Sequence, residues 1–204
     1  MNKQELISKI KSLQDISSEE KAYLIELVNT KKKYGLVWEE KPEDVEEQLR
    51  SMLPVFKEVK ERAIISENTD APNHILIEGD NLHALTALSY THEGKIDVIY
   101  IDPPYNTGNK DFIYNDAYVD KEDTYRHSKW LSFMDKRLRL AKKLLSEKGV
   151  IFISISDIEN AQLKLLCSEI FNENNFIANL IWSNKEGGGS SDSKHIRIKH
   201  EYIL

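Results

Sequence analysis

The stretch that decides the fold is "IDVIYIDPPYNTGNKDF", residues 96–112, in which an apolar run ends in an acid, two prolines and a tyrosine. The run up to Ile101 is rich in β-branched residues and predicts a buried strand. Proline has no backbone N–H, and it biases the preceding residue toward extended backbone. Asp102, Pro103 and Pro104 therefore predict a rigid loop of acceptors, made of a carboxylate and free carbonyl groups.

Further strands are expected on both sides of this run. They are "HILIEG" (74–79), "VIFISI" (150–155), "FIANLIW" (176–182) and "HEYIL" (200–204). Like "KIDVIYI" (95–101), they read as continuous apolar runs rather than alternating ones. This pattern is typical of a parallel α/β sheet that is covered on both faces.

Helices are expected between these strands. Asp80 or Asn81 can cap a helix through "NLHALTALSY", and a longer helix is predicted from about residue 123 to residue 146, ended by Gly149. Ser156 and Glu159 have the spacing of a capping box that opens the next helix.

Residues 1–70 have a different texture, because they are highly charged and carry apolar residues at helical spacing. Ser17 or Ser18 is placed to cap a helix there. The polar segment "SENTDAPN", residues 66–73, is the best boundary in the chain. We therefore expect a helical N-terminal region over 1–70 and a second domain over 74–204.

Composition excludes several classes of protein. The 204 residues carry a net charge of −6, which argues against a nonspecific nucleic-acid coat. No apolar run approaches the roughly 18 residues of a membrane helix, and the N-terminus has no apolar signal core, so a cytoplasmic protein without a membrane span is expected. The single cysteine, Cys167, shares an apolar helix face, and no Cys/His spacing suits a metal.

Two acids stand where strands are expected to end, which is where open α/β sheets bind ligands. Asp80 alone is more simply a helix cap, whereas Asp102 before two prolines is an unusual turn. The Asp102 carboxylate and the free carbonyls suit a planar group that carries an amino group, and Tyr105 offers a ring for stacking. An exocyclic amino group of a nucleobase fits this description, provided that the base is flipped out of its duplex.

These residues also carry a family resemblance. "DPPYNTG" (102–108), preceded by "LIEGDNLHAL" (76–85), resembles the amino-directed DNA methyltransferases, in particular the modification (Mod) subunit of type III restriction–modification systems. The later segments agree in their order, so the resemblance covers about residues 74–204. It implies a Rossmann-like methyltransferase fold, incomplete and in permuted order, with a helical N-terminal appendage.

The resemblance further implies adenine-N6 methylation of double-stranded DNA with S-adenosylmethionine as methyl donor. By this resemblance Asp102 and the Pro103 carbonyl hold the amino group, Pro104 stiffens the loop and Tyr105 stacks on the flipped adenine. Carbon-5 methylation of cytosine would need a cysteine nucleophile, and the apolar setting of Cys167 favours an amino target instead.

Cofactor and DNA contacts follow from the same resemblance. Asp80, Asn81 and Asp102 are expected to face the cofactor. The residues expected to contact DNA or the flipped base are Asn106, Lys185, Lys194, Arg197 and Tyr202. The implied partners are a second copy of the full-length chain and a restriction subunit with helicase and nuclease activities.

One departure from the family concerns the glycine loop of the cofactor site. The only glycine cluster, Gly187–Gly189, does not lead into a helical pattern. We therefore expect these 204 residues to be the N-terminal, catalytic-motif part of a longer enzyme, and to bind the cofactor weakly and be inactive alone. Two alternatives stay open: an RNA or protein-amide methyltransferase, and a noncatalytic assembly or DNA-binding module.

Overall fold

The computed structural model describes residues 3–14, 16–29, 36–65, 67–68, 70–183 and 199–204. The chain forms two compact units, Met1–Val37 and Trp38–Leu204. This structural division falls earlier than the polar segment 66–73, because helix α3 (Asp44–Ser51) is hydrogen-bonded into the second unit. A catalytic domain that begins at residue 74 stays a prediction about function.

The first unit is a pair of helices, α1 (Lys3–Ser12) and α2 (Ser18–Asn29). Ser17 caps α2, as the sequence predicts. The Glu20 N–H donates to Ser17 Oγ at 3.2 Å, and the Ser17 N–H donates to the Glu20 carboxylate at 2.7 Å. This reciprocal pair is a capping box.

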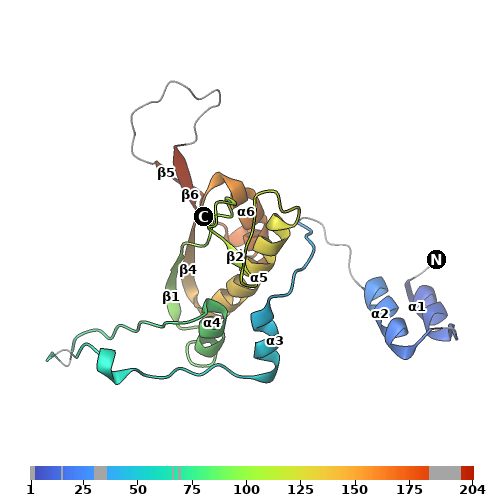
Figure 1. The fold of residues 1–204 in the computed structure, drawn as a ribbon, viewed down its shortest axis with the longest axis horizontal. Helices are drawn as coiled ribbons and strands as arrows, with labels where there is room; N and C mark the ends of the chain where they lie inside the picture. The colour runs from blue at the N-terminus through green and yellow to red at the C-terminus, as the bar shows by residue number, and fades with distance from the viewer. Residues whose placement is uncertain (1–2, 15, 30–35, 66, 69, 184–198) are drawn as a thin grey trace. The chain divides into compact units, whose positions relative to one another are not determined.

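The second unit is built on a four-stranded sheet in the order β1-β4-β6-β5 (Figure 1). The strands are β1 (Ile96–Ile101), β4 (Leu145–Ile155), β5 (Leu180–Ser183) and β6 (His200–Ile203). Only β1 and β4 are parallel, whereas β6 runs antiparallel to both of its neighbours. The expected all-parallel sheet is therefore wrong. β5 and β6 are consecutive strands that pair directly, and parallel pairing would require a crossover connection.

A strand at residues 74–79 is also not formed. This segment has no sheet partner among the described residues. Ile75 is 76% exposed and Leu76 is 96% exposed. The apolar run is real, but an apolar run alone does not supply a neighbouring strand.

Three helices lie on one side of the sheet: α4 (Asn81–Ser89), α5 (Arg126–Leu144) and α6 (Asp157–Phe171) (Figure 1). The core between these layers contains the fully buried side chains Trp130, Leu138, Ile153, Ile155, Leu163 and Leu166. On β1, by contrast, Val98 and Tyr100 are exposed. The expectation that both faces are covered is therefore wrong for the described part of the chain.

Gly149 does not end a helix, because α5 already ends at Leu144 and β4 begins with the next residue. Gly149 lies within β4, where a Cβ would stand 2.7 Å from the Ile96 carbonyl oxygen. The glycine thus allows the close approach of β1 at the irregularity in its pairing with β4.

A short β-hairpin was not predicted from the sequence. It consists of β2 (Ile113–Tyr114) and β3 (Ala117–Tyr118). Its turn residues Asn115 and Asp116 have φ values of 47° and 62°, a conformation that these two residue types tolerate. Two single-turn helices, η1 (Lys60–Arg62) and η2 (Glu173–Asn175), complete the described elements. Among the described helices, none is long and apolar enough to cross a membrane.

Candidate active site

The acceptor loop, defined as Asp102–Tyr105, begins directly after the last residue of β1. The side chain of Asp102 is exposed, and the three residues that follow it are half-buried. Ligands of open α/β sheets bind at this edge, beyond the carboxyl ends of the strands. The predicted carboxylate is thus available at the surface where chemistry is expected.

The two proline carbonyls of the loop differ. The indole Nε1–H of Trp130 donates a hydrogen bond to the Pro104 carbonyl at 2.7 Å, and Trp130 is fully buried in α5. The Pro103 carbonyl accepts no hydrogen bond from the described residues. The Pro103 carbonyl, which the family resemblance assigned to an amino group, is therefore open. The Pro104 carbonyl attaches the loop to the buried Trp130.

Tyr105 is fixed through its hydroxyl group, which donates to Glu201 Oε2 at 3.3 Å. Burial raises the pKa of Tyr105, and the carboxylates of Asp102 and Glu201 raise it further. The phenol therefore stays protonated across the physiological range and acts as a donor. Glu201 lies on β6, and no sequence signal pointed to it.

Asn106 follows the acceptor loop and is completely buried, with a φ of 58°. Its Nδ2 donates to Glu159 Oε1 at 2.5 Å and to the Arg126 carbonyl at 3.3 Å. Asn106 was expected to contact DNA, but its side chain has no exposed surface in this structure. Asn106 instead attaches the end of the acceptor loop to Glu159 on α6 and to Arg126 on α5.

Glu159 also departs from its expected role. Ser156 precedes α6 but makes no side-chain capping bond, so the predicted capping box is wrong. Glu159 is fully buried and lies 2.6 Å from His127 Nδ1 as well as bonding Asn106. Burial raises the pKa of Glu159, against the lowering effects of the hydrogen bond from Asn106 and the charge of His127.

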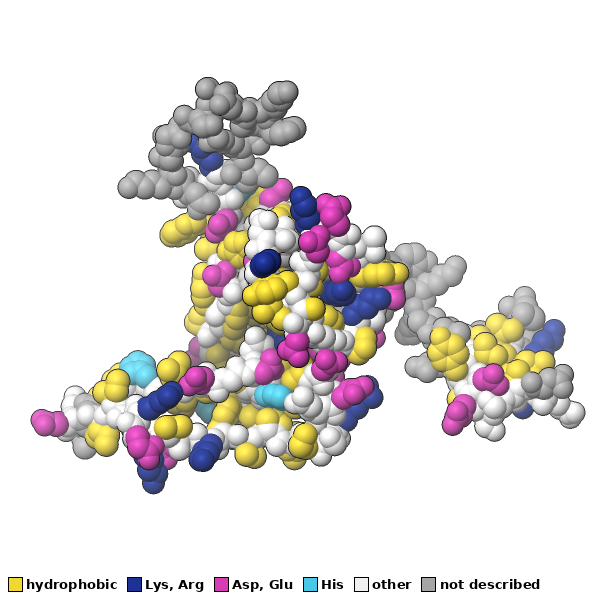
Figure 2. Space-filling view, viewed as in Figure 1, with side chains coloured by type: hydrophobic (Ala, Val, Ile, Leu, Met, Phe, Trp, Pro, Cys, Tyr) yellow, Lys and Arg dark blue, Asp and Glu magenta, His cyan; other side chains and the backbone are white. Residues whose placement is uncertain are grey.

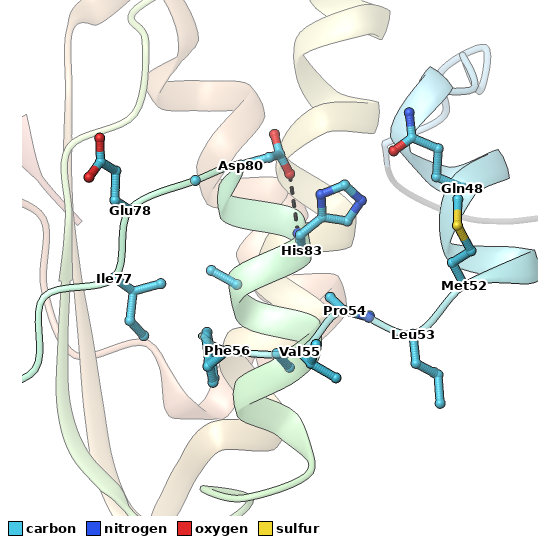
Figure 3. Close-up of a pocket in the computed structure, with 13 residues that line it drawn as sticks. Gln48, Met52, Leu53, Pro54, Val55, Phe56, Ile77, Glu78, Asp80 and His83 are labelled. Atoms are coloured by element: carbon cyan, nitrogen blue, oxygen red, sulfur yellow. Dashed lines mark hydrogen bonds between the residues drawn. The ribbon is translucent and has the colours of Figure 1, made fainter. Parts of the chain in front are cut away.

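Asp80 caps α4, as its simpler interpretation predicted. Its Oδ1 accepts a hydrogen bond from the Leu82 N–H at 2.8 Å. It also accepts one from the His83 N–H at 3.2 Å (Figure 3). Asn81 accepts a hydrogen bond from Arg137 Nε at 2.6 Å. Asp80 and Asn81 thus have structural partners, and of the three predicted cofactor residues, Asp80, Asn81 and Asp102, Asp80 is the one that lines the pocket described next.

This pocket has a volume of about 330 Å³ and lies beside the first turn of α4 (Figure 3). One wall is residues 52–56, which are apolar, and the other carries Glu78, Asp80 and His83. Gly79 lies between these polar residues with a φ of 148°, and a Cβ there would meet nothing within 4 Å. An apolar wall opposite a few polar groups is typical of a small-molecule site.

Of the other predicted DNA contacts, Tyr202 is the one among the described residues, and its hydroxyl group is bonded away from the acceptor loop. The Tyr202 hydroxyl lies 2.9 Å from His200 Nε2 and donates to Asp157 Oδ1 at 3.3 Å. Successive strand residues point to opposite faces, so Glu201 contacts Tyr105 while Tyr202 faces away from it. Lys185, Lys194 and Arg197 lie outside the described residues. Figure 2 shows acidic and basic side chains interspersed on the drawn face of the second unit.

Cys167 has the character of a core residue. It is half-buried on α6, and burial raises the pKa of its thiol to about 12. A thiol with such a pKa is protonated at neutral pH and is a poor nucleophile. The chemistry of this site therefore rests on the acceptor loop.

A loop of acceptors after a strand defines a site for an amino group, and the pocket at the start of α4 is a separate candidate site for a small molecule. Residues 96–204 match the family described as DNA methylase, and the chain belongs to this family. A putative DNA modification methylase from Thermus thermophilus is a structural neighbour with 20% identity, covering 62% of this chain and 49% of that one. Its TM-score of 0.42 is too low to support a conclusion.

Curated relatives show which kinds of DNA methylase this chain is similar to. The probable type III restriction-modification enzyme HindVI Mod subunit of Haemophilus influenzae is 46% identical over 140 residues, covering 68% of this chain and 18% of the relative. The type III EcoP15I Mod subunit of Escherichia coli is 39% identical over 161 residues, with coverages of 68% and 24%. The type II methyltransferase M.KpnI of Klebsiella pneumoniae is 44% identical over 137 residues, with coverages of 66% and 32%. This chain thus spans less than a third of the length of these relatives.

Proposed function

We propose that the protein containing this chain is an adenine-N6 DNA methyltransferase, the modification subunit of a type III restriction–modification system. The observation that carries the proposal is the acceptor loop. Asp102 is exposed and the Pro103 carbonyl is open, while Pro104 and Tyr105 are held by the protein. The membership in the DNA methylase family and the identity to Mod subunits support the same function.

In this proposal the adenine leaves the duplex and its amino group enters the acceptor loop. The Asp102 carboxylate and the Pro103 carbonyl each accept one N–H, which fixes the nitrogen lone pair in one direction. Tyr105 presents its ring to the base while its hydroxyl group stays bonded to Glu201. Catalysis consists mainly of positioning and of preorganised acceptors for a nitrogen that becomes positive as it is methylated.

The methyl donor would be S-adenosylmethionine, which supplies an electrophilic methyl group on its sulfonium. The pocket beside α4 fits the adenosine part in kind: residues 52–56 offer apolar surface, and Gly79 leaves room for close approach. Both hydrogen bonds to Asp80 end on Oδ1, so Oδ2 is the oxygen for a ligand hydroxyl or amino group. Asn81 is bonded to Arg137 and would act behind the pocket rather than in it.

The wider features follow from the same proposal. Residues 74–204 would form the catalytic half of a Rossmann-like methyltransferase domain. The full-length protein would act on double-stranded DNA as a homodimer, together with a restriction subunit, in the cytoplasm. Lys185, Lys194 and Arg197 would contact phosphates.

Methyl transfer tests the proposal. The full-length product of the reading frame that contains residues 1–204 is incubated with tritiated S-adenosylmethionine and duplex DNA. Asp102→Ala should lower transfer by about 100-fold or more, which is typical for loss of one preorganised polar group in an active site. Asp97→Asn is the matched control, because Asp97 is an exposed acid at the other end of β1. Undiminished transfer by Asp102→Ala would refute the assigned site.

A further inference from the structure

A polar cluster lies next to the acceptor loop. It consists of Asn106, which follows the loop, Glu159 on α6 and His127 on α5, and the His127 side chain is 40% exposed. Glu159 and Asn106 are both 0% exposed, although they are 53 residues apart in the chain. One oxygen, Glu159 Oε1, serves both partners: it lies 2.5 Å from Asn106 Nδ2 and 2.6 Å from His127 Nδ1.

A buried carboxylate is costly, and α6 does not need this one. Glu159 lies in the first turn of α6, where an acid normally points to solvent and favours the helix dipole. Here it turns inward, and Ser156 beside it makes no capping bond. Removing a charge from water costs free energy unless its partners compensate. The inward position of Glu159 therefore does not stabilise α6, but it allows the contacts with Asn106 and His127.

The hydrogen bond between Asn106 and Glu159 lies at a residue with a strained backbone conformation. Asn106 has a φ of 58°, in the left-handed region that favours glycine and that asparagine tolerates better than most residues. This residue immediately follows Tyr105, so its conformation sets the direction of the acceptor loop. Among the described side chains, only Glu159 hydrogen-bonds the Asn106 amide.

We propose that Glu159 is a positioning residue, which holds Asn106 in its left-handed conformation and thereby fixes the aim of Asp102 and the Pro103 carbonyl. Its effect on methyl transfer rests on the proposed function. Trp130 and Glu201 hold the loop at Pro104 and Tyr105, and Glu159 is the third support, at the point where the chain turns. Asn106 Oδ1 and Glu159 Oε2 have no partner among the described residues, so Glu159 holds the amide through one oxygen, and the second acceptor of Asn106 Nδ2 is the Arg126 carbonyl at 3.3 Å.

Three variants of the full-length protein separate this role from simple packing. Glu159→Ala removes the acceptor, and Glu159→Gln keeps a carbonyl oxygen for Asn106. Asn106→Gly removes the amide, and glycine adopts left-handed and right-handed backbone about equally readily, so the left-handed conformation is allowed but no longer held. We expect Glu159→Ala and Asn106→Gly each to lower kcat by at least about tenfold, as misplacement of a catalytic group does. The KM for DNA should stay within about twofold, because the groups that bind DNA are untouched. Glu159→Gln should keep most of the activity.

The double variant and a structural readout complete the test. Glu159→Ala with Asn106→Gly should be no slower than either single variant, since both remove the same contact. Amide hydrogen exchange over residues 102–112 should accelerate at least about tenfold in Glu159→Ala, because the loop opens more often. The matched control is Leu166→Ala, which removes an equally buried side chain seven residues further along α6.

The outcomes distinguish the two proposals. If the unaltered protein transfers methyl groups and Glu159→Ala has an unchanged kcat, the positioning role is wrong. If the unaltered protein transfers none, the proposed function fails and hydrogen exchange alone decides. Equal exchange over residues 102–112 in Glu159→Ala and Leu166→Ala would then overturn the positioning role.

Discussion

At the scale of single residues, the acceptor loop combines open acceptors with occupied ones. Asp102 is exposed and the Pro103 carbonyl is open, whereas Pro104, Tyr105 and Asn106 each have a partner in the protein. Motif spacing predicted the open groups, because prolines remove donors wherever they stand. The occupied groups were not predictable, because Trp130, Glu201 and Glu159 reach the loop only through tertiary folding.

Trp130→Phe tests the support under Pro104. The change removes the indole N–H and leaves the Pro104 carbonyl without its donor, in a part-buried position. We expect a loss of about 1–3 kcal/mol in the free energy of unfolding, measured with urea. Met134→Leu is the matched control, since it conserves volume at an equally buried position of α5. A Trp130→Phe protein as stable as the control would contradict the role of this hydrogen bond.

Cys167 should be inert in the folded protein. Because burial raises its pKa to about 12, only about one thiol in 10⁴ is ionised at pH 8. Iodoacetamide should therefore label the native protein far more slowly than the urea-unfolded chain, and the native rate should rise as the pH is raised toward 12. Cys167→Ala should leave methyl transfer unchanged. Equal labelling of native and unfolded protein would show that the thiol is accessible and ionised.

At the scale of elements, a buried ion-pair network attaches α3 to the helix layer. Arg137 on α5 donates to both oxygens of Glu43 at 2.8 and 3.1 Å and to Asn81 at the start of α4. Lys136 donates to Glu46 at 2.6 Å. The chain after α3 forms the apolar wall of the pocket, so Arg137 connects the two sides of that pocket.

Arg137→Met tests this connection. It leaves the buried carboxylate of Glu43 without its guanidinium, and we expect a loss of about 3–5 kcal/mol in the free energy of unfolding. Arg139→Met is the control on the same helix. Its pair with Asp135 is half exposed, so its loss should cost less than about 1 kcal/mol. Equal effects of the two substitutions in urea unfolding would contradict the structural role of Arg137.

Sequence patterns succeeded best for elements with long apolar periodicity. The strands at 95–101, 150–155 and 200–204 and the helices α4, α5 and α6 were predicted and are confirmed. The run at 74–79 has the composition of a strand but no partner, and pairing is not encoded in a single segment. Strand direction failed for a similar reason, because it depends on which neighbour a strand meets.

At the scale of the whole molecule, residues 38–204 form one compact unit and residues 1–37 form another. Composition predicted a helical, charged N-terminal region over 1–70, whereas the compact units divide between Val37 and Trp38. Segment 38–65 looks like the preceding residues in charge and spacing. Its bonds to α5 are long-range contacts that no local pattern reveals.

Deletion of residues 1–37 tests this division. If the second unit folds by itself, the shortened protein should keep the thermal unfolding midpoint of the longer one within about 4 °C, which corresponds to roughly 1 kcal/mol or less. Deletion of residues 1–51 is the contrasting variant, because it also removes Glu43 and Glu46 from the ion-pair network. Loss of cooperative unfolding on removing 1–37 would contradict the independence of the second unit.

If the acceptor loop presents an adenine amino group for methylation, the chemical identity of the methylated product reveals it. DNA treated with the full-length protein and S-adenosylmethionine is digested to nucleosides and analysed by mass spectrometry. The site predicts N6-methyldeoxyadenosine from the unaltered protein, and a loss of about 100-fold or more from Asp102→Ala. A 5-methylated deoxycytidine as the product, or N6-methyldeoxyadenosine in equal amounts from both proteins, would contradict the claim.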